Sequence, residues 1–525
     1  MTLDQDRVRG PQTVWLVLAG LAQAASMAMP GSGQAHGWLQ VLSLTLLARA
    51  LVRTAKTSPS LHNIARSSAG AGGIFALVWL AASFWWLYVS MHEVGGLPAL
   101  LAVLAVLALA AALALYYAAV CAIWGVLASR LLSARPGSVS VLFAALWTLA
   151  ELMRGQWLTG FPWGAGGYAH VDGVLSVWAP WVGVYGVGAV SAGLAMRLAL
   201  TGWGWSALKP LLGVGLLSLG MQFWGPTWTT STGVGQVELL QANISQTAKF
   251  DADSGIRDAL QWYDAQLRKS QQSLVVAPET AVPLLPQYLP DRYWAGLQQH
   301  FAESDAALAL VGVPLGNRAN GYTNSVVALG PAQMGHYQYD KAHLVPFGEF
   351  IPPGFAWFVR LMNIPLGDFR AGSTDQQSVA WQGQRLALNI CYEDLFGEEL
   401  AQRFKNRETA PTALVNVSNI AWFGDTLAVD QHLNISRMRA LELGRPMLRA
   451  TNTGATAIID HQGRVTAQLP RFTRGSLVGQ YEGRAGLTPY VRWVSAWGLW
   501  PLWGLCGAVV ALAGVRQAKS RRRGR

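Results

Sequence analysis

Apolar runs that are nearly free of charged side chains fill both ends of this chain. About 20 apolar residues are enough to cross a bilayer as a helix. Runs of this kind lie at residues 10–48, 67–92, 97–128, 138–152, 173–196, 210–227 and 494–515. The first run is long enough for two spans, with a turn at Pro30-Gly31-Ser32-Gly33. The pattern therefore predicts a multi-pass helical membrane domain with about eight spans.

Lysine and arginine gather in alternate gaps between these runs. The basic gaps contain Arg7, Arg9, Arg49, Arg53, Lys56, Arg66, Arg130, Arg135, Arg197, Lys209 and the tail 516–525. The other short gaps hold almost no basic residue, with Arg154 as the exception. Because basic loops stay on the cytoplasmic side, both chain ends are predicted to be cytoplasmic. The long insert before the last span is then predicted to face outward.

The composition favours a membrane protein over a nucleic-acid-binding protein. Charged residues make up 13% of the chain, against about 25% in soluble domains. The chain has 24 Trp, a residue type that collects at membrane interfaces. The net charge of +11 lies largely in the gaps and the tail, where membrane orientation explains it. We expect no nucleic-acid partner and no cofactor or metal, since the histidines lack metal-ligand spacing.

The insert has the pattern of a soluble α/β domain. Short runs rich in Val, Leu and Ala, typical of buried strands, lie at 237–240, 274–277, 307–313, 386–390 and 413–417. Helical patterns lie between them at 256–272, 398–406 and 429–443, the last ended by Gly444. We expect three parts: a membrane domain at 1–230, the outward domain at 231–487, and the last span with a basic cytoplasmic tail at 488–525.

Reactive side chains stand at the ends of predicted strands in the insert. Glu279 and Cys391 follow two of the apolar runs closely, and Lys341 opens a stretch that ends in Glu349. A thiol between a strand and a helix N-terminus is well placed as a nucleophile, because the exposed N–H groups favour the thiolate and can hold an oxyanion. A carboxylate can take the thiol proton, and a lysine can balance charge on a tetrahedral intermediate. Taken singly, each residue also has an ordinary structural explanation.

Longer sequence motifs surround these residues and occur together along the chain. The stretches are Leu158–Trp163, Pro278-Glu279, Lys341–Glu349, Asn389–Glu393, Asn416–Gly424, Arg437–Pro446, Thr451–Gly454 and Gly486–Tyr490. They resemble the Glu-Lys-Cys pattern of the nitrilase superfamily. In their residues and in their order along the chain, these stretches are similar to the bacterial apolipoprotein N-acyltransferases. The resemblance covers nearly the whole chain.

The resemblance implies a nitrilase-like α-β-β-α sandwich carried by membrane spans, on the periplasmic side of a bacterial inner membrane. Members of that family take an acyl chain from a phospholipid, typically phosphatidylethanolamine, as a thioester on the cysteine. They pass the chain to the N-terminal α-amine of a diacylated apolipoprotein. By position, Glu279 would be the general base, Lys341 the oxyanion stabiliser and Cys391 the nucleophile.

Three further residues match positions that support activity in the family. Glu349 is expected to orient Lys341 or the base. The backbone N–H of Tyr392 is a candidate oxyanion donor. Glu393 is the third of these positions, directly after Tyr392 in the sequence.

Four aromatic residues are candidate substrate contacts. Phe250 stands where the family often has Trp, so an aromatic face is kept but the indole N–H donor is absent. Trp357 lies in the apolar stretch 355–365, which is either a core-packing helix or an arm that touches the membrane and lines the lipid path. Trp422 and Phe423 have the same two explanations, a packed loop or a membrane contact.

Two other functions fit parts of the pattern. A membrane-tethered nitrilase-type amidase would use the same three residues on a small soluble substrate, and hydrolysis of small amides without action on phospholipid would favour it. A transporter would need ionisable residues within its spans. Only Glu93, Glu151 and Arg154 lie near the spans, at their ends. Acyl transfer therefore explains more of the chain than either alternative.

Cysteine labelling tests the predicted topology. A cysteine introduced near Asp251 should react with a membrane-impermeant reagent in cells whose outer envelope is permeabilised, because the insert is predicted to lie outside the inner membrane. Labelling that begins only after the inner membrane is broken would refute the assignment.

Overall fold

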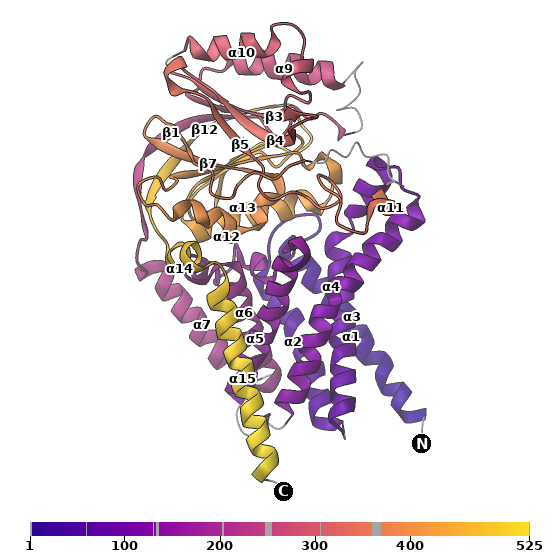
Figure 1. Ribbon diagram of the computed structural model, residues 1–525. Helices are drawn as coiled ribbons and strands as arrows, with labels where there is room; N and C mark the ends of the chain where they lie inside the picture. The colour runs from indigo at the N-terminus through magenta and orange to yellow at the C-terminus, as the bar shows by residue number, and fades with distance from the viewer. Residues whose placement is uncertain are drawn as a thin grey trace. The chain divides into compact units, whose positions relative to one another are not determined.

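The chain folds into two units in the computed structural model (Figure 1). The structure describes residues 3–58, 60–129, 131–132, 136–201, 204–246, 255–304, 306–359 and 369–523. The first unit, called the helical unit here, comprises Met1–Trp85, Leu100–Pro226 and Leu499–Arg525. The second, called the sheet unit, comprises Trp86–Ala99 and Thr227–Gly498.

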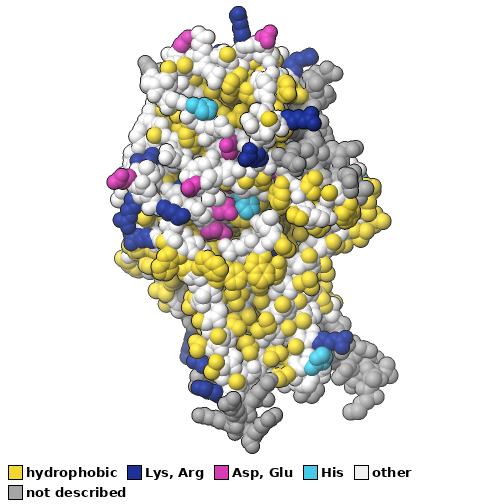
Figure 2. All heavy atoms as spheres, viewed as in Figure 1, with side chains coloured by type: hydrophobic (Ala, Val, Ile, Leu, Met, Phe, Trp, Pro, Cys, Tyr) yellow, Lys and Arg dark blue, Asp and Glu magenta, His cyan; other side chains and the backbone are white. Residues whose placement is uncertain are grey.

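Long helices build the helical unit. Within the described residues they are α1 (Leu3–Met27), α2 (Gly37–Thr57), α3 (Leu61–Phe84), α4 (Ala99–Ala128), α5 (Pro136–Gln156), α6 (Ala179–Thr201), α7 (Trp205–Trp224) and α15 (Trp500–Arg523). By length and composition alone, 5 helical stretches in the described part of the chain are long and apolar enough to cross a membrane. They are Leu61–Phe84, Ala99–Ala128, Pro136–Thr159, Ser176–Thr201 and Trp500–Lys519. Figure 2 shows hydrophobic side chains gathered over this unit.

Two ionisable residues that the sequence placed at span ends are buried inside the helical unit. Arg154 donates from Nη1 to the carbonyls of Phe161, at 2.7 Å, and Trp163, at 2.6 Å. Glu151 accepts from the N–H of Gly166 at 2.8 Å. Both side chains therefore bind backbone groups of the irregular connection between α5 and α6 that would otherwise be buried without these partners. Arg154 breaks the alternation of basic gaps because it is a buried structural residue and not a loop residue.

The sheet unit contains two six-stranded sheets. The first has the order β12 (Gly475–Gly486), β1 (Thr229–Gln241), β2 (Leu274–Val276), β3 (Leu308–Asn317), β4 (Gly321–Leu329), β5 (Tyr337–Asp340). The second has the order β11 (Val465–Gln468), β10 (Ala457–Ile459), β9 (Met447–Thr451), β8 (Ala413–Ser418), β7 (Gln384–Ile390), β6 (Val379–Trp381). The neighbours β1, β2 and β3 are parallel, as are β7, β8 and β9.

The two sheets face each other and helices cover their outer sides. Side chains from both sheets, including Leu239, Val276, Leu388 and Val415, form one buried core. Helices α9 (Gly255–Lys269) and α10 (Tyr293–Ala302) pack on the first sheet through a second core. Helix α13 (Leu427–Leu443) packs against β9 of the second sheet (Figure 1). This is the α-β-β-α arrangement that the resemblance implied.

All five predicted strands are present, because parallel strands covered on both faces are almost continuously apolar. The antiparallel strands at the sheet edges were not predicted, since strands such as β11 and β12 contain exposed residues between their more buried ones and so form no continuous apolar run. The predicted helix at 398–406 is present but only partly α-helical: a four-residue α12 (Gly397–Leu400) passes into a 3₁₀-helix at Ala401–Phe404.

Most of the connection between α3 and α4 belongs to the sheet unit. The end of the predicted span at 67–92 is therefore corrected to Phe84. Helix α3 ends at Phe84, and a short π-helix, η1, follows at Val89–Val94. The indole N–H of Trp86 donates to Gln431 Oε1 on α13 at 3.0 Å, and its ring lies 4.3 Å from the ring of Phe423. A polar contact and an aromatic contact therefore tie this connection to the sheet unit.

Some predicted positions lie outside the described residues. Phe250 and Asp251 fall in the segment 247–254, and the second half of the apolar stretch falls in 360–368. The first half is described: Phe355 and Trp357 are exposed, and Ala356–Val359 forms the one-turn helix α11. A core-packing role for Trp357 is therefore wrong, since most of its surface is exposed.

Candidate active site

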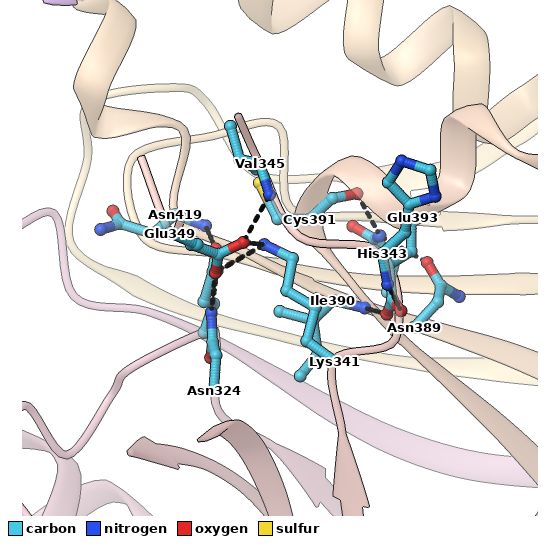
Figure 3. A network of polar contacts seen from close by, with 12 residues as sticks. Asn324, Lys341, His343, Val345, Glu349, Asn389, Ile390, Cys391, Glu393 and Asn419 are labelled. Carbon is cyan, nitrogen blue, oxygen red and sulfur yellow. Dashed lines mark hydrogen bonds and ion pairs between the residues drawn. The ribbon is translucent and has the colours of Figure 1, made fainter. Parts of the chain in front are cut away.

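Three strand ends bring the predicted catalytic residues together. Glu279 lies just after β2, Lys341 directly after β5 and Cys391 directly after β7. Strands β2 and β5 belong to one sheet and β7 to the other, so the site lies where the two facing sheets end. In Figure 3 the Cys391 side chain points toward the Lys341 ammonium and the Glu349 carboxylate.

Lys341 is almost fully buried between two carboxylates. Its Nζ lies 2.9 Å from Glu349 Oε2 and 3.4 Å from Glu279 Oε1 (Figure 3). Burial alone lowers the pKa of a lysine, but the Glu349 and Glu279 charges outweigh it and raise the pKa of Lys341 above its ordinary value. Lys341 is therefore a permanent cation at the site. Its closer partner is Glu349, which leaves Glu279 less tightly bound by the ammonium.

Asn324, in the middle of β4, holds both carboxylates. Its Nδ2 donates to Glu279 Oε1 and to Glu349 Oε1, each at 2.7 Å. The other oxygen of Glu279 accepts from the backbone N–H of Asn419 at 2.8 Å. Nothing in the sequence distinguished Asn324 or Asn419 in these roles, because each contact joins segments that are distant along the chain.

The turn that carries Glu349 is closed by its own side chain. Glu349 Oε2 accepts from the N–H of Val345 at 2.8 Å. The bond spans four residues, from Val345 to Glu349. It holds the Glu349 carboxylate in the position where it pairs with Lys341. Glu349 thus lies within ion-pair distance of Lys341, one of the two groups that it was expected to orient.

Cys391 adopts a backbone conformation that is uncommon for a residue with a side chain. Its φ is +54°, and the left-handed region costs a non-glycine residue roughly 1–2 kcal/mol. Such strain persists only where the surroundings over-determine the conformation, and it concentrates at functional sites. Cys391 as a whole is only partly buried, whereas the strand residue before it, Ile390, is fully buried. Cys391 packs against the edge of the core between the two sheets.

The surroundings of the thiol keep it protonated. Burial raises the pKa of Cys391 to about 12, the negative charge of Glu279 adds to this, and Lys341 and the hydroxyl of Ser418 oppose it. The helix expected after β7 begins at Cys391 but is a five-residue 3₁₀-helix, Cys391–Leu395, and not an α-helix. The raised pKa therefore favours a protonated thiol in the resting site. The proton must leave as the sulfur attacks, which requires a base.

Glu393 joins the lysine segment to the cysteine segment. Its Oε2 accepts from the N–H of Ile390 at 2.6 Å, and its Oε1 accepts from the N–H groups of Ala342, at 2.7 Å, and His343, at 3.1 Å. The hydroxyl of Tyr339 donates to both oxygens at 2.9 Å. One buried carboxylate therefore fixes the backbone on both sides of the site.

The remaining predicted residues have more varied positions. The Tyr392 ring is buried and lies 5.3 Å from the ring of Phe396. Trp422 and Phe423 are half-buried in a 3₁₀ turn, and Phe423 packs on Trp86. Among the described residues, no group of three His, Cys, Asp or Glu side chains is arranged to hold a metal ion.

Comparison with known proteins identifies a family for each of the two parts of the chain. Residues 236–490 match the family model described as carbon-nitrogen hydrolase, and residues 19–197 match that described as apolipoprotein N-acyltransferase N-terminal domain. The sheet unit is thus a carbon-nitrogen hydrolase domain joined to a helical domain. The chain shares 52% identity over 512 residues with the apolipoprotein N-acyltransferase of Verminephrobacter eiseniae, covering 93% of each chain.

A second relative, from Ralstonia nicotianae, carries the same name and is 48% identical over 495 residues, or 93% of this chain and 90% of the relative. The chain belongs to the apolipoprotein N-acyltransferase family. Among solved structures, the C. elegans NitFhit protein aligns with a TM-score of 0.37 at 16% identity, over 51% of this chain and 64% of that chain.

The raised thiol pKa makes a prediction about pH. Alkylation of Cys391 by iodoacetamide should accelerate about tenfold per pH unit from pH 7 to 10, because the thiolate fraction rises in that way well below the pKa. Mass spectrometry of the Cys391 peptide, in a variant with Cys121→Ser and Cys506→Ser, measures this rate. A rate that levels off near the ordinary pKa of cysteine would contradict the prediction.

The Glu393 contacts make a prediction about stability. Glu393→Gln should lower the free energy of unfolding by at least ~1–3 kcal/mol, because an amide nitrogen would face a buried N–H group and leave it without an acceptor. Thermal unfolding in detergent, followed by tryptophan fluorescence, measures the effect. The matched control is Glu408→Gln, at an exposed position, which should unfold like the wild type. Equal melting temperatures for the two variants would show that the carboxylate is not required.

Proposed function

We propose that this protein N-acylates lipoproteins by a two-step route through a thioester on Cys391. The acyl donor is a membrane phospholipid, with phosphatidylethanolamine as the expected species. The acceptor is the α-amine of the diacylglyceryl cysteine at the N-terminus of an apolipoprotein. Membership of the family supports the reaction. The observation that carries the mechanism is a thiol beside two carboxylates and a buried ammonium, in surroundings that raise the pKa of the thiol.

In the first step the thiol attacks the ester carbonyl of the donor. Glu279 takes the proton from Sγ as the C–S bond forms, since the resting thiol is protonated. Lys341 and the backbone N–H of Tyr392 stabilise the negative charge on the carbonyl oxygen. The C–O bond of the ester then breaks, and the departing lysophospholipid alkoxide receives the proton from Glu279. The acyl chain remains as a thioester.

In the second step the acceptor amine attacks the thioester. The amine must be neutral to attack, and Glu279 accepts one of its protons as the C–N bond forms. The C–S bond breaks, Cys391 leaves as a thiolate and recovers its proton from Glu279. The products are an amide on the lipoprotein and the free enzyme. A thioester divides one difficult transfer into two easier ones.

Glu349 supports both steps by its contact with Lys341. The ion pair of 2.9 Å keeps the ammonium in one position, so Glu279 need not serve as its main counter-ion. Asn324 holds the two carboxylates at hydrogen-bonding distance from one amide group. This arrangement suits a base that must gain and lose a proton in each step.

The membrane gives the reaction its geometry. In the proposal, residues 1–230 and 488–525 anchor the enzyme in the cytoplasmic membrane, and residues 231–487 work on the periplasmic side. Donor and acceptor are both anchored in the outer leaflet, so a site held at that leaflet meets both in two dimensions. Trp357, Trp422, Phe423 and Phe250 are the proposed lipid contacts, and the exposure of Trp357 supports its part.

Acyl-enzyme formation tests the mechanism. Purified enzyme incubated with phosphatidylethanolamine alone should gain one acyl mass on the Cys391 peptide, and neutral hydroxylamine should remove it. Glu279→Gln should slow the gain by roughly 10²–10⁴-fold if it is the general base. Lys341→Ala should slow it by roughly 10²–10³-fold if it stabilises the oxyanion. A diacylated lipopeptide should then discharge the acyl-enzyme and yield an N-acylated product.

Controls separate this route from its alternatives. Cys391→Ser should accumulate little acyl-enzyme, since a hydroxyl is a poorer nucleophile. Lys405→Ala, at an exposed position, should acylate like the wild type. An acyl group on another residue, or full transfer by Cys391→Ala, would refute the covalent mechanism. Hydrolysis of small amides without any reaction with phospholipid would favour an amidase.

A further inference from the structure

A buried polar cluster lies beneath the nucleophile, and the mechanism above does not use it. It consists of Asp394, His432, Ser436 and Arg449, all almost completely buried. His432 Nε2 lies 2.8 Å from Asp394 Oδ1, and Arg449 Nη2 lies 2.8 Å from His432 Nδ1. Ser436 donates to Asp394 and accepts from Arg449 Nη1. Polar groups buried so deeply are costly unless they are paired, and the cluster pairs them.

These contacts determine which nitrogen of His432 carries the proton. A guanidinium group only donates, so Nδ1 must accept from Arg449. The proton of the neutral ring is therefore on Nε2. Burial and the neighbouring Arg449 charge keep the pKa of His432 below its ordinary value, in agreement with a neutral ring. The single Nε2–H is thus shared between two acceptors, Asp394 Oδ1 at 2.8 Å and the carbonyl oxygen of Cys391 at 3.2 Å.

The Cys391 carbonyl receives a second donor from β8. Asn416 Nδ2 lies 3.2 Å from it and also donates to Asn389 Oδ1 at 2.6 Å. In a planar trans peptide the C=O and the following N–H point in opposite directions. Donors that fix the Cys391 carbonyl therefore also fix the direction of the Tyr392 N–H, away from the cluster. Hydrogen bonds to a carbonyl also polarise the peptide and strengthen its N–H as a donor.

We propose that His432, aligned by Asp394 and Arg449 and assisted by Asn416, is a positioning residue that aims and polarises the Tyr392 N–H as an oxyanion donor. The inference rests on the proposed function, because it deepens the role of Tyr392 in acyl transfer. Cys391 has a left-handed φ, which a residue with a side chain keeps only under constraint. The donors to its carbonyl oxygen supply such a constraint, because without them the peptide after Cys391 can rotate toward a common conformation.

Two amide substitutions at one position separate this role from simple core packing. Both His432→Gln and His432→Asn keep an oxygen that can accept from Arg449. The longer Gln can also place its NH₂ near the former Nε2 and donate to the Cys391 carbonyl, whereas Asn is too short to reach it. A role in packing alone would not distinguish a donor that reaches the carbonyl from one that does not.

Two reactions of the same thiol provide the readouts. Acyl-enzyme formation from phosphatidylethanolamine develops an oxyanion, whereas alkylation by iodoacetamide does not. His432→Asn should slow acylation by about 10–100-fold, part of the loss expected on deleting an oxyanion donor, and leave alkylation unchanged. His432→Gln should recover most of the acylation rate. Asn416→Leu, which removes the second donor to the carbonyl, should show the same selective loss of acylation.

The outcomes are distinguishable. If wild-type enzyme forms no acyl-enzyme on Cys391, the proposed function fails. If the wild type acylates and His432→Asn, His432→Gln and Asn416→Leu all acylate equally fast, the positioning role is wrong. Parallel losses of acylation and alkylation in all three variants would likewise overturn it, since they would indicate general damage to the site.

Discussion

The buried ammonium of Lys341 is the constraint on which the site depends. A cation removed from water needs carboxylates within a few ångströms, and two of them, Glu279 and Glu349, meet it from separate segments of the chain. Asn324 then separates and holds the two acids, so that their mutual repulsion is moderated by shared donors. The arrangement leaves one acid tightly paired and the other available for proton transfer. Geometry thus divides two similar carboxylates into two roles.

The same logic of shared partners extends beyond the reacting groups. Glu393 gathers N–H donors from the segments that follow β5 and β7, which belong to different sheets. Asp394, the next residue, turns the other way and pairs with His432 and Arg449 on the far side of the nucleophile. Two consecutive acids thus anchor opposite sides of the turn that carries Cys391. A positive φ at Cys391 is sustained because both of its flanks are fixed.

The sequence predicted the features that depend on local pattern. Parallel strands such as β7 and β8 are covered on both faces, so their apolar runs revealed them, and the residues at their ends followed. Motif resemblance supplied Lys341 and Glu349, which no periodicity distinguishes from surface residues. Asn324, Asn419 and His432 were missed in their roles because a hydrogen bond across the fold leaves no trace in sequence spacing. The 3₁₀ turn after Cys391 was predicted as a helix because its polar residues also suit a helix start.

The connection at Trp86–Ala99 has a consequence for how the enzyme can be dissected. The chain passes between the helical and sheet units at four places, near residues 85, 99, 226 and 498. A soluble fragment cut at the two obvious boundaries, 227 and 498, would lose the indole that packs on Phe423 and binds Gln431. The sheet unit is therefore assembled from two separate pieces of the gene product. Any excised catalytic fragment would have to include residues 86–99, by fusion or as an added peptide, to keep the contacts of Trp86 with Gln431 and Phe423.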